Sequence, residues 1–227
     1  MQQTVFLSGL PRSGSTLLSA ILNQNPMIHA EGNSAVCQLM WDMQQSCETN
    51  AAEQLAANDR YGTQQALVAS IPKTYYAQTD RPIIVDKCRS WTLPANMAMI
   101  RRYITDKPKV IVLTRQIGEV VESFMSLYER NDFPITAEQL LVAHSEPIMR
   151  SNDGVEYAKA NNRGEFLFID YQDLCDYPTE VLTSICTFCE WEAFAHDFDN
   201  VVNTRAENDS VYGLVGMHDI RKKVGKL

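Results

Sequence analysis

Three consecutive stretches near the amino terminus decide the fold: Thr4-Val5-Phe6-Leu7-Ser8, then Gly9-Leu10-Pro11-Arg12-Ser13-Gly14-Ser15-Thr16, then Leu17-Leu18-Ser19-Ala20-Ile21-Leu22. The first is a short apolar run typical of a buried strand, and the third places its apolar residues on one face of a helix. The middle stretch has the spacing G-x-x-x-x-G-x-[ST] of a phosphate-binding loop, where backbone N–H groups and a helix N-terminus surround an anion. The sequence therefore predicts a strand, a phosphate loop and a helix.

This loop lacks the lysine that usually precedes its last hydroxyl residue. Ser15 stands in that position, and Arg12 is the only cation in the loop. We therefore expect Arg12, Ser13, Gly14, Ser15 and Thr16 to bind a terminal phosphate without the lysine contact made to the β- and γ-phosphates of ATP. An ordinary Gly/Ser turn that caps a helix is the alternative, but strand, glycines, hydroxyls, cation and amphipathic helix coincide here.

Short apolar runs alternate with helical patterns along the rest of the chain, which predicts an α/β fold. The expected architecture is a three-layer, P-loop-like fold with a central parallel sheet flanked by helices, because continuous apolar strands need cover on both faces. The expected strands are Thr4–Ser8, Ile83–Asp86, Val110–Thr114 and Phe166–Asp170. The expected helices are Ser15–Asn23, Leu93–Ile104, Gly118–Glu129, Ala137–Arg150, Gly154–Ala160 and Thr179–Cys189, with an irregular tail after Trp191.

A length of 227 residues favours one domain, 1–227, with a helical insertion around 34–78 that serves as a lid or acceptor wall. Twenty-eight acidic and 20 basic residues give a net charge of −8, which argues against a nucleic-acid partner or a broad membrane-binding surface. Any polyanion must therefore meet a local basic cluster.

No apolar run approaches the roughly 20 residues of a membrane span, and no signal peptide is visible, so we expect a cytoplasmic protein. The spacing of Cys186 and Cys189 admits a redox or zinc site. Both cysteines fall in an apolar helical pattern with no matching second pair, which favours core packing. No metal-ligand set is visible.

The stretch from Phe6 to Leu18 resembles the 5′-phosphosulfate loop of the sulfotransferases that use 3′-phosphoadenosine 5′-phosphosulfate (PAPS). Pro11-Arg12-Ser13-Gly14 and the following Asn25-Pro26 are more similar to the tyrosylprotein and bacterial branches than to the cytosolic small-molecule enzymes. The resemblance implies transfer of a sulfuryl group from PAPS to a hydroxyl or amine acceptor, with 3′,5′-bisphosphoadenosine (PAP) as product and no required metal. Neither the acceptor nor the oligomeric state can be read from the sequence.

The resemblance also implies residues that bind the nucleotide. Arg115 at a strand end and Ser123 eight residues later are similar to the pair that holds the 3′-phosphate, although a solvated Arg and a helix-surface Ser are the plain alternative. Tyr171 follows the last strand and would lie near the nucleotide, or pack against the next helix. Arg221 and Lys226 belong to a basic run that either adds positive charge to the site or is a solvated tail.

Catalysis needs cations where charge develops and a base for the acceptor proton. Arg12 is one cation, and Lys87 at the end of its strand is the other, unless it is a surface lysine paired with Asp86 or a helix carboxylate. The resemblance implies Glu31 as the base, with His29 as the alternative. His144, His196 and His218 have no companion motif, so structural or solvent-exposed positions are expected for them.

Two other functions remain open. In a P-loop kinase or NTPase, Thr16 and Asp86 would hold magnesium, although the missing lysine argues against this reading. A nucleotide-binding protein without catalytic activity would follow if the 3′-phosphate site were incomplete.

Overall fold

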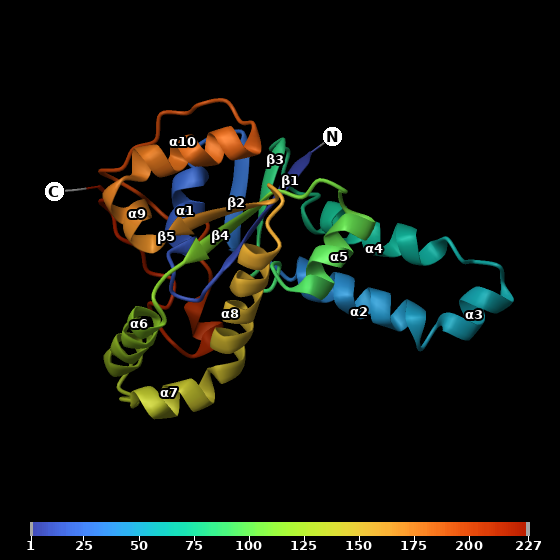
Figure 1. The fold of residues 1–227 in the computed structure, drawn as a ribbon, viewed down its shortest axis with the longest axis horizontal. Coiled ribbons are helices and arrows are strands. Elements are labelled where there is room, and N and C mark those ends of the chain that lie inside the picture. Colours follow the sequence, from blue (N-terminus) through green and yellow to red (C-terminus); the bar gives the residue numbers. More distant parts are fainter. Residues whose placement is uncertain (1, 226–227) are drawn as a thin grey trace.

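A computed structural model describes residues 2–225 and contains a five-stranded sheet (Figure 1). Every neighbouring pair of strands is parallel, in the order β2-β3-β1-β4-β5. The strands are β1 (Gln3–Gly9), β2 (Ile28–Asn33), β3 (Ile83–Lys87), β4 (Val110–Thr114) and β5 (Phe166–Asp170). Because all strands run the same way, their carboxyl ends meet at one edge of the sheet, where α/β proteins bind ligands.

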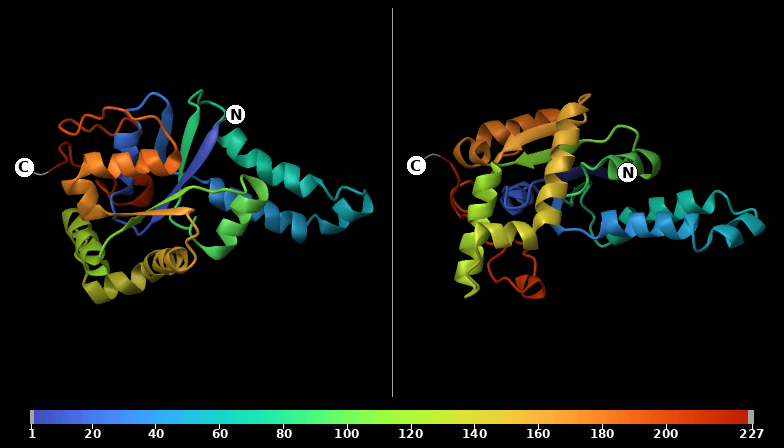
Figure 2. Two further views of the ribbon diagram at one scale, coloured as in Figure 1. Left: turned by 45° about the horizontal axis from the view of Figure 1, so that its top comes forward. Right: turned by 60° about the horizontal axis from the view of Figure 1, so that its bottom comes forward.

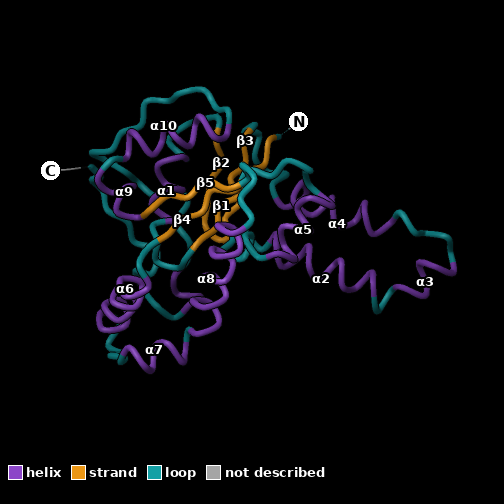
Figure 3. The backbone as a smooth tube through the Cα atoms, viewed as in Figure 1, coloured by secondary structure: helices purple, strands orange, loops and turns teal. Residues whose placement is uncertain are grey.

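Helices cover both faces of the sheet, and this confirms the predicted three-layer α/β architecture (Figure 3). Successive residues of β1 show the alternation: Val5 and Leu7 pack into one apolar cluster, and Phe6 packs into the other. The first cluster includes α1 (Ser15–Leu22), α9 (Tyr171–Asp176) and α10 (Pro178–Cys189). The second includes α5 (Pro94–Tyr103), α6 (Ile117–Arg130), α7 (Ala137–Ala143) and α8 (Ser145–Ala160).

The region between β2 and β3 forms a helical arm. It consists of α2 (Val36–Glu48), α3 (Ala52–Ala57) and α4 (Thr63–Tyr75). Figure 2 shows this arm from two sides, and in both views it extends away from the sheet. Met40 and Val68 are fully buried where α2 packs along α4, so the base of the arm is joined to the main apolar core.

Strand β2 was not predicted. Its sequence, Ile28-His29-Ala30-Glu31-Gly32-Asn33, has few of the β-branched and aromatic residues that mark strands. It lies at the edge of the sheet and pairs only with β3, through Ile28 opposite Ile83 and Asn33 opposite Lys87. Pairing with an apolar neighbour, rather than local propensity, therefore makes this segment a strand.

Several predicted helix boundaries were wrong. The helix expected over Ala137–Arg150 is interrupted at His144, whose Nε2 lies 2.7 Å from the hydroxyl of Tyr128. The helix that follows, α8, runs unbroken through Gly154, where a separate helix was expected to begin. An additional short helix, α9, follows β5 directly, and the tail contains one 3-10 turn at Asp209–Tyr212.

The cysteines of the described residues are all free thiols. Cys189 is buried in the core as expected, whereas Cys186 is partly exposed at its margin. Within residues 2–225, no helix is both long and apolar enough to cross a bilayer.

Candidate active site

The loop between β1 and α1 has the form of an anion-binding loop. Helix α1 begins at Ser15, and no side chain caps its first turn, so backbone N–H groups there remain available to a ligand. Gly14 adopts a left-handed conformation with φ of 89°, and a Cβ at this position would lie 2.7 Å from Cδ2 of Tyr171. Ser13 is buried and donates its hydroxyl to the carbonyl of Leu10 at 2.5 Å, so it shapes the loop from inside.

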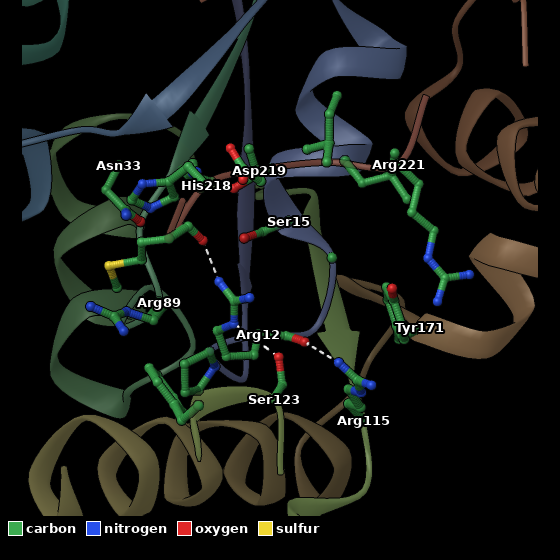
Figure 4. Close-up of a pocket in the computed structure, with 18 residues that line it drawn as sticks. Arg12, Ser15, Asn33, Arg89, Arg115, Ser123, Tyr171, His218, Asp219 and Arg221 are labelled. Carbon is green, nitrogen blue, oxygen red and sulfur yellow. Dashed lines mark hydrogen bonds between the residues drawn. The ribbon is translucent and has the colours of Figure 1, made fainter. Parts of the chain in front are cut away.

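A cavity opens beside this loop at the carboxyl edge of the sheet (Figure 4). Its lining contains five cationic side chains and one carboxylate, Asp219, in a chain whose net charge is −8. The local basic cluster that an anion site requires in an acidic protein is therefore present. Nine sequence-predicted residues line the cavity: Arg12, Gly14, Ser15, Thr16, Lys87, Arg115, Ser123, Tyr171 and Arg221.

Arg12 occupies the centre of the cavity in Figure 4. Its backbone has a positive φ of 58°, which is uncommon for a residue other than glycine and is found at functional loops. Its Nε donates to the hydroxyl of Ser123 at 3.1 Å, and its Nη1 donates to the carbonyl of Met217. These contacts from α6 and from the tail fix the direction of the guanidinium.

Arg115 directly follows β4 and contacts the phosphate loop. Its Nη1 donates to the carbonyl of Arg12 at 2.9 Å, and its Nε donates to Glu119 at 3.0 Å. Its Cζ lies 4.3 Å from the ring centroid of Tyr171, a cation–π contact. Burial raises the pKa of the Tyr171 phenol, so this ring is neutral at physiological pH. Ser123 shares the cavity with Arg115, but its hydroxyl accepts from Arg12.

Lys87 is 3% exposed at the end of β3, and its Nζ lies 3.1 Å from Oε2 of Glu207. Burial lowers the pKa of Lys87, and the attraction of Glu207 opposes that effect. Lys87 is therefore neither on the surface nor paired with Asp86. The carboxylate of Asp86 is buried and accepts hydrogen bonds from Ser34, Tyr76 and the Trp91 indole. Burial raises its pKa despite these donors.

The two predicted bases lie outside the cavity lining. His29 and Glu31 belong to β2, and His29 Nε2 lies 3.1 Å from Oε2 of Glu31. The His29 ring is buried against Tyr76, whereas the Glu31 side chain is 29% exposed. Their assignment as base stays a prediction.

The tail supplies site residues that the sequence patterns did not single out. His218 was expected to be structural or solvent-exposed, but it lines the cavity, with Nδ1 2.5 Å from Oδ1 of Asp209. Asn33 from β2 and Arg89 after β3 also line the cavity. None of these residues belongs to a recognisable motif, and only the folded structure brings them to the cavity. Lys226 lies outside the described residues.

Comparisons with known proteins place the chain in context. The family model described as "Sulfotransferase family" matches residues 4–196. No curated protein matches the chain. The sulfotransferase domain of the Synechococcus PCC 7002 olefin synthase is 24% identical with a TM-score of 0.57, covering 85% of this chain and 75% of that one.

Two further solved structures share the fold. The sulfotransferase domain from the curacin biosynthetic pathway is 16% identical with a TM-score of 0.59, covering 99% of this chain and 84% of that one. A sulfotransferase from Alicyclobacillus acidocaldarius is 12% identical with a TM-score of 0.59, covering 94% of this chain and 89% of that one. Because the family match over residues 4–196 spans most of the chain and includes the phosphate loop, this chain belongs to the sulfotransferase family and is a transferase.

Proposed function

We propose that this protein transfers the sulfuryl group of PAPS to a hydroxyl or amine acceptor. The observation that carries the proposal is the hydrogen bond between Arg115 and the carbonyl of Arg12, which joins two cationic sites in one cavity. A nucleotide with a phosphosulfate at one end and a 3′-phosphate at the other needs two such sites. A loop without the usual lysine suits this ligand better than ATP.

The residues divide into two groups around the nucleotide. The 5′-phosphosulfate would bind the backbone of the loop with Ser15, Thr16 and Arg12, and Ser13 would support the loop from behind. The 3′-phosphate would bind Arg115 and Ser123. Tyr171 would contact the nucleotide from its place beside Arg115 and Gly14. Arg221 would add positive charge, and the same role is proposed for Lys226 by resemblance alone.

Sulfuryl transfer needs an in-line acceptor oxygen and cations beside the sulfuryl and leaving-phosphate oxygens. Lys87 and Arg12 line one cavity and would provide that charge. Glu31 is the base implied by family resemblance, with His29 as its alternative. The chemistry requires no metal.

The kinase alternative is weakened by Asp86. Its carboxylate accepts from Tyr76 and Trp91 in the core and does not line the cavity beside Thr16. A magnesium site of the P-loop type would need that carboxylate to face the loop.

Finer assignments are also proposed. We propose that the loop is closer to the tyrosylprotein and bacterial branches than to the cytosolic small-molecule enzymes. We also propose that residues 1–227 are one domain, in which the arm of α2–α4 serves as a lid or acceptor wall. The cytoplasmic location stays a prediction.

Calorimetry with PAP, ADP and ATP plus magnesium tests the donor. We expect PAP to bind more tightly than ADP, because charge-assisted contacts to a 3′-phosphate contribute about 1.5–3 kcal/mol each. Equal affinities for PAP and ADP would contradict the proposal, and tight magnesium-dependent ATP binding would favour the kinase. Labelled PAPS offered with phenols, tyrosyl peptides, sugars and lipid alcohols would then identify the acceptor.

A further inference from the structure

Glu207, in the tail, has four polar partners beside the cavity: three hydrogen-bond partners and one ion-pair partner, His218. Its Oε2 lies 3.1 Å from Nζ of Lys87 and 3.3 Å from Nε2 of His218. Its Oε1 lies 3.3 Å from Nδ2 of Asn33 and 3.2 Å from the hydroxyl of Tyr212. Three of these partners, Lys87, His218 and Asn33, line the cavity. With its side chain 11% exposed, Glu207 is held in one place.

Strand β2 is shaped to admit this carboxylate. A Cβ at Gly32 would lie 2.1 Å from Cγ and 2.3 Å from Cδ of Glu207. Any residue larger than glycine would therefore force the Glu207 side chain away from Lys87. The Glu207 side chain therefore occupies the space that a side chain at position 32 would need.

A second carboxylate orients the histidine beside Glu207. Asp209 accepts from His218 twice, through Nδ1 at 2.5 Å and through the backbone N–H at 3.1 Å. The other ring nitrogen of His218 then faces Oε2 of Glu207. Asp209 and His218 are positioning residues in this arrangement, because they act through Glu207.

The charges around Glu207 explain how binding of the donor would change the basicity of its carboxylate. Burial raises the pKa of Glu207, but the stronger combined attraction of Lys87 and His218 lowers it below its ordinary value. Paired with Lys87, Glu207 is therefore a weak base. A sulfuryl group that drew the ammonium of Lys87 to its own oxygens would take away that partner and make the carboxylate a better proton acceptor.

From this geometry we propose that Glu207 is the general base of the reaction, released for that role when the donor engages Lys87. The inference rests on the proposed sulfuryl transfer. The acceptor O–H gives its proton to a carboxylate oxygen of Glu207, while the acceptor oxygen forms a bond to sulfur. The bond between sulfur and the 5′-phosphate oxygen breaks, PAP leaves with that electron pair, and Glu207 later loses the proton to water.

Glu31 is a less suitable base on this geometry. Its carboxylate contacts His29 rather than Lys87, and its side chain is 29% exposed, whereas that of Glu207 is 11% exposed. Both carboxylates act electrostatically on Lys87, but only Glu207 forms a hydrogen bond with it. The two assignments of the base therefore predict different effects of Glu207→Gln and Glu31→Gln on turnover.

The test compares Glu207→Gln with Glu31→Gln and uses Asp199→Asn as a matched control. Asp199 is a tail carboxylate that is 80% exposed and paired with Lys223, away from the cavity. Turnover is followed as PAP formed from labelled PAPS, with phenol, 4-nitrophenol and water as acceptors. PAP affinity and the melting temperature are measured for every variant.

For Glu207→Gln, kcat with phenol and with water should fall by roughly 10²–10⁴, the range for loss of a general base. With 4-nitrophenol, which ionises readily, the fall should be less than about tenfold, and PAP affinity should stay within about threefold. Glu207→Asp keeps a carboxylate and should retain more activity than Glu207→Gln even if both melt at a lower temperature. Asp199→Asn should match the wild type.

An equal loss with all three acceptors would show a structural role and overturn the proposal. So would a Glu207→Gln enzyme with wild-type turnover, or an acceptor-dependent loss found in Glu31→Gln alone. A wild-type protein that neither binds PAP nor forms it from PAPS would overturn the proposed function together with this inference. Turnover that is indifferent to Glu207 would overturn the inference only.

Discussion

The guanidinium of Arg115 lies 4.3 Å above the ring of Tyr171, and the two residues follow adjacent strands of the sheet. Thr114 pairs with Asp170 at the ends of β4 and β5, so the residues that come next leave the sheet side by side. Gly14 lies against the same tyrosine ring. The phosphate loop, the predicted 3′-phosphate arginine and the predicted nucleotide-contacting tyrosine therefore form one packed unit.

Arg115→Ala should weaken PAP binding much more than ADP binding, because only PAP carries the 3′-phosphate. Losing one charge-assisted contact should cost about 1.5–3 kcal/mol, or roughly 10- to 150-fold in the dissociation constant of PAP. Calorimetry with both nucleotides measures this difference. Arg150→Ala, which removes an exposed arginine paired with Glu146, is the control. A parallel loss for PAP and ADP would assign Arg115 to the shared part of the nucleotide.

Gly14→Ala should destabilise the fold and abolish tight PAP binding. The left-handed backbone should cost about 1–2 kcal/mol with a Cβ, and the contact with Tyr171 adds to that cost. Gly118→Ala is the matched control, since a Cβ there meets no atom within 4 Å and its φ is not positive. Thermal melting and PAP titration of both variants check this. A Gly14→Ala protein with unchanged melting temperature would show that the loop relaxes easily.

Lys87→Ala should lower kcat at saturating PAPS by roughly 10²–10³, the effect of removing one preorganised charge partner of the transition state. PAP, which lacks the sulfuryl group, should bind the variant within a few-fold of wild type. Lys109→Ala removes a lysine paired with Glu190 at the opposite edge of the sheet and should leave kcat unchanged. Normal kcat in Lys87→Ala would remove this residue from the mechanism.

Acid should loosen the tail through Glu207. Because its folded-state pKa is depressed, its stabilising effect is present above the ordinary value of 4.5 and is lost as the pH falls below it. Asp209 also has a lowered pKa, so it stabilises the fold above its ordinary value of 3.8 and loses that effect as the pH falls below it. Melting temperatures of wild type and Glu207→Gln should therefore differ most near neutrality and converge as the pH falls below 4.5. Parallel curves over this range would contradict the coupling.

The sequence predicted the four strands whose residues are apolar on both faces. Val110–Thr114 is an example, because four of its five residues are buried between helices on both sides of the sheet. Such a short, continuous apolar run fits few structures other than a buried strand. Strand β2 escaped notice because only Ile28 and Ala30 add apolar burial there. Its conformation depends on β3, which lies 50 residues further along the chain, and a local pattern cannot express that dependence.

The same distinction applies to the site. Arg12, Lys87, Arg115 and Tyr171 were predictable because each follows a recognisable strand, and strand ends converge in a parallel sheet. Glu207 and His218 come from a segment with almost no regular structure, beyond the residues that the family model matches. Long-range contacts hold that segment, such as Val201 to Lys222 at 2.7 Å and Val224 to Phe198 at 2.9 Å. No short motif encodes such contacts.

The hydrogen bond from Arg12 to the carbonyl of Met217 joins residues that are 205 positions apart. Met217 and Arg221 from the tail line the same cavity as Arg12. A ligand bound there would therefore connect the early and late parts of the chain. Its binding energy would then add to the unfolding free energy of the whole molecule, by about 2.7 kcal/mol at a hundredfold excess over the dissociation constant. During synthesis, this contact forms only after the tail has emerged from the ribosome.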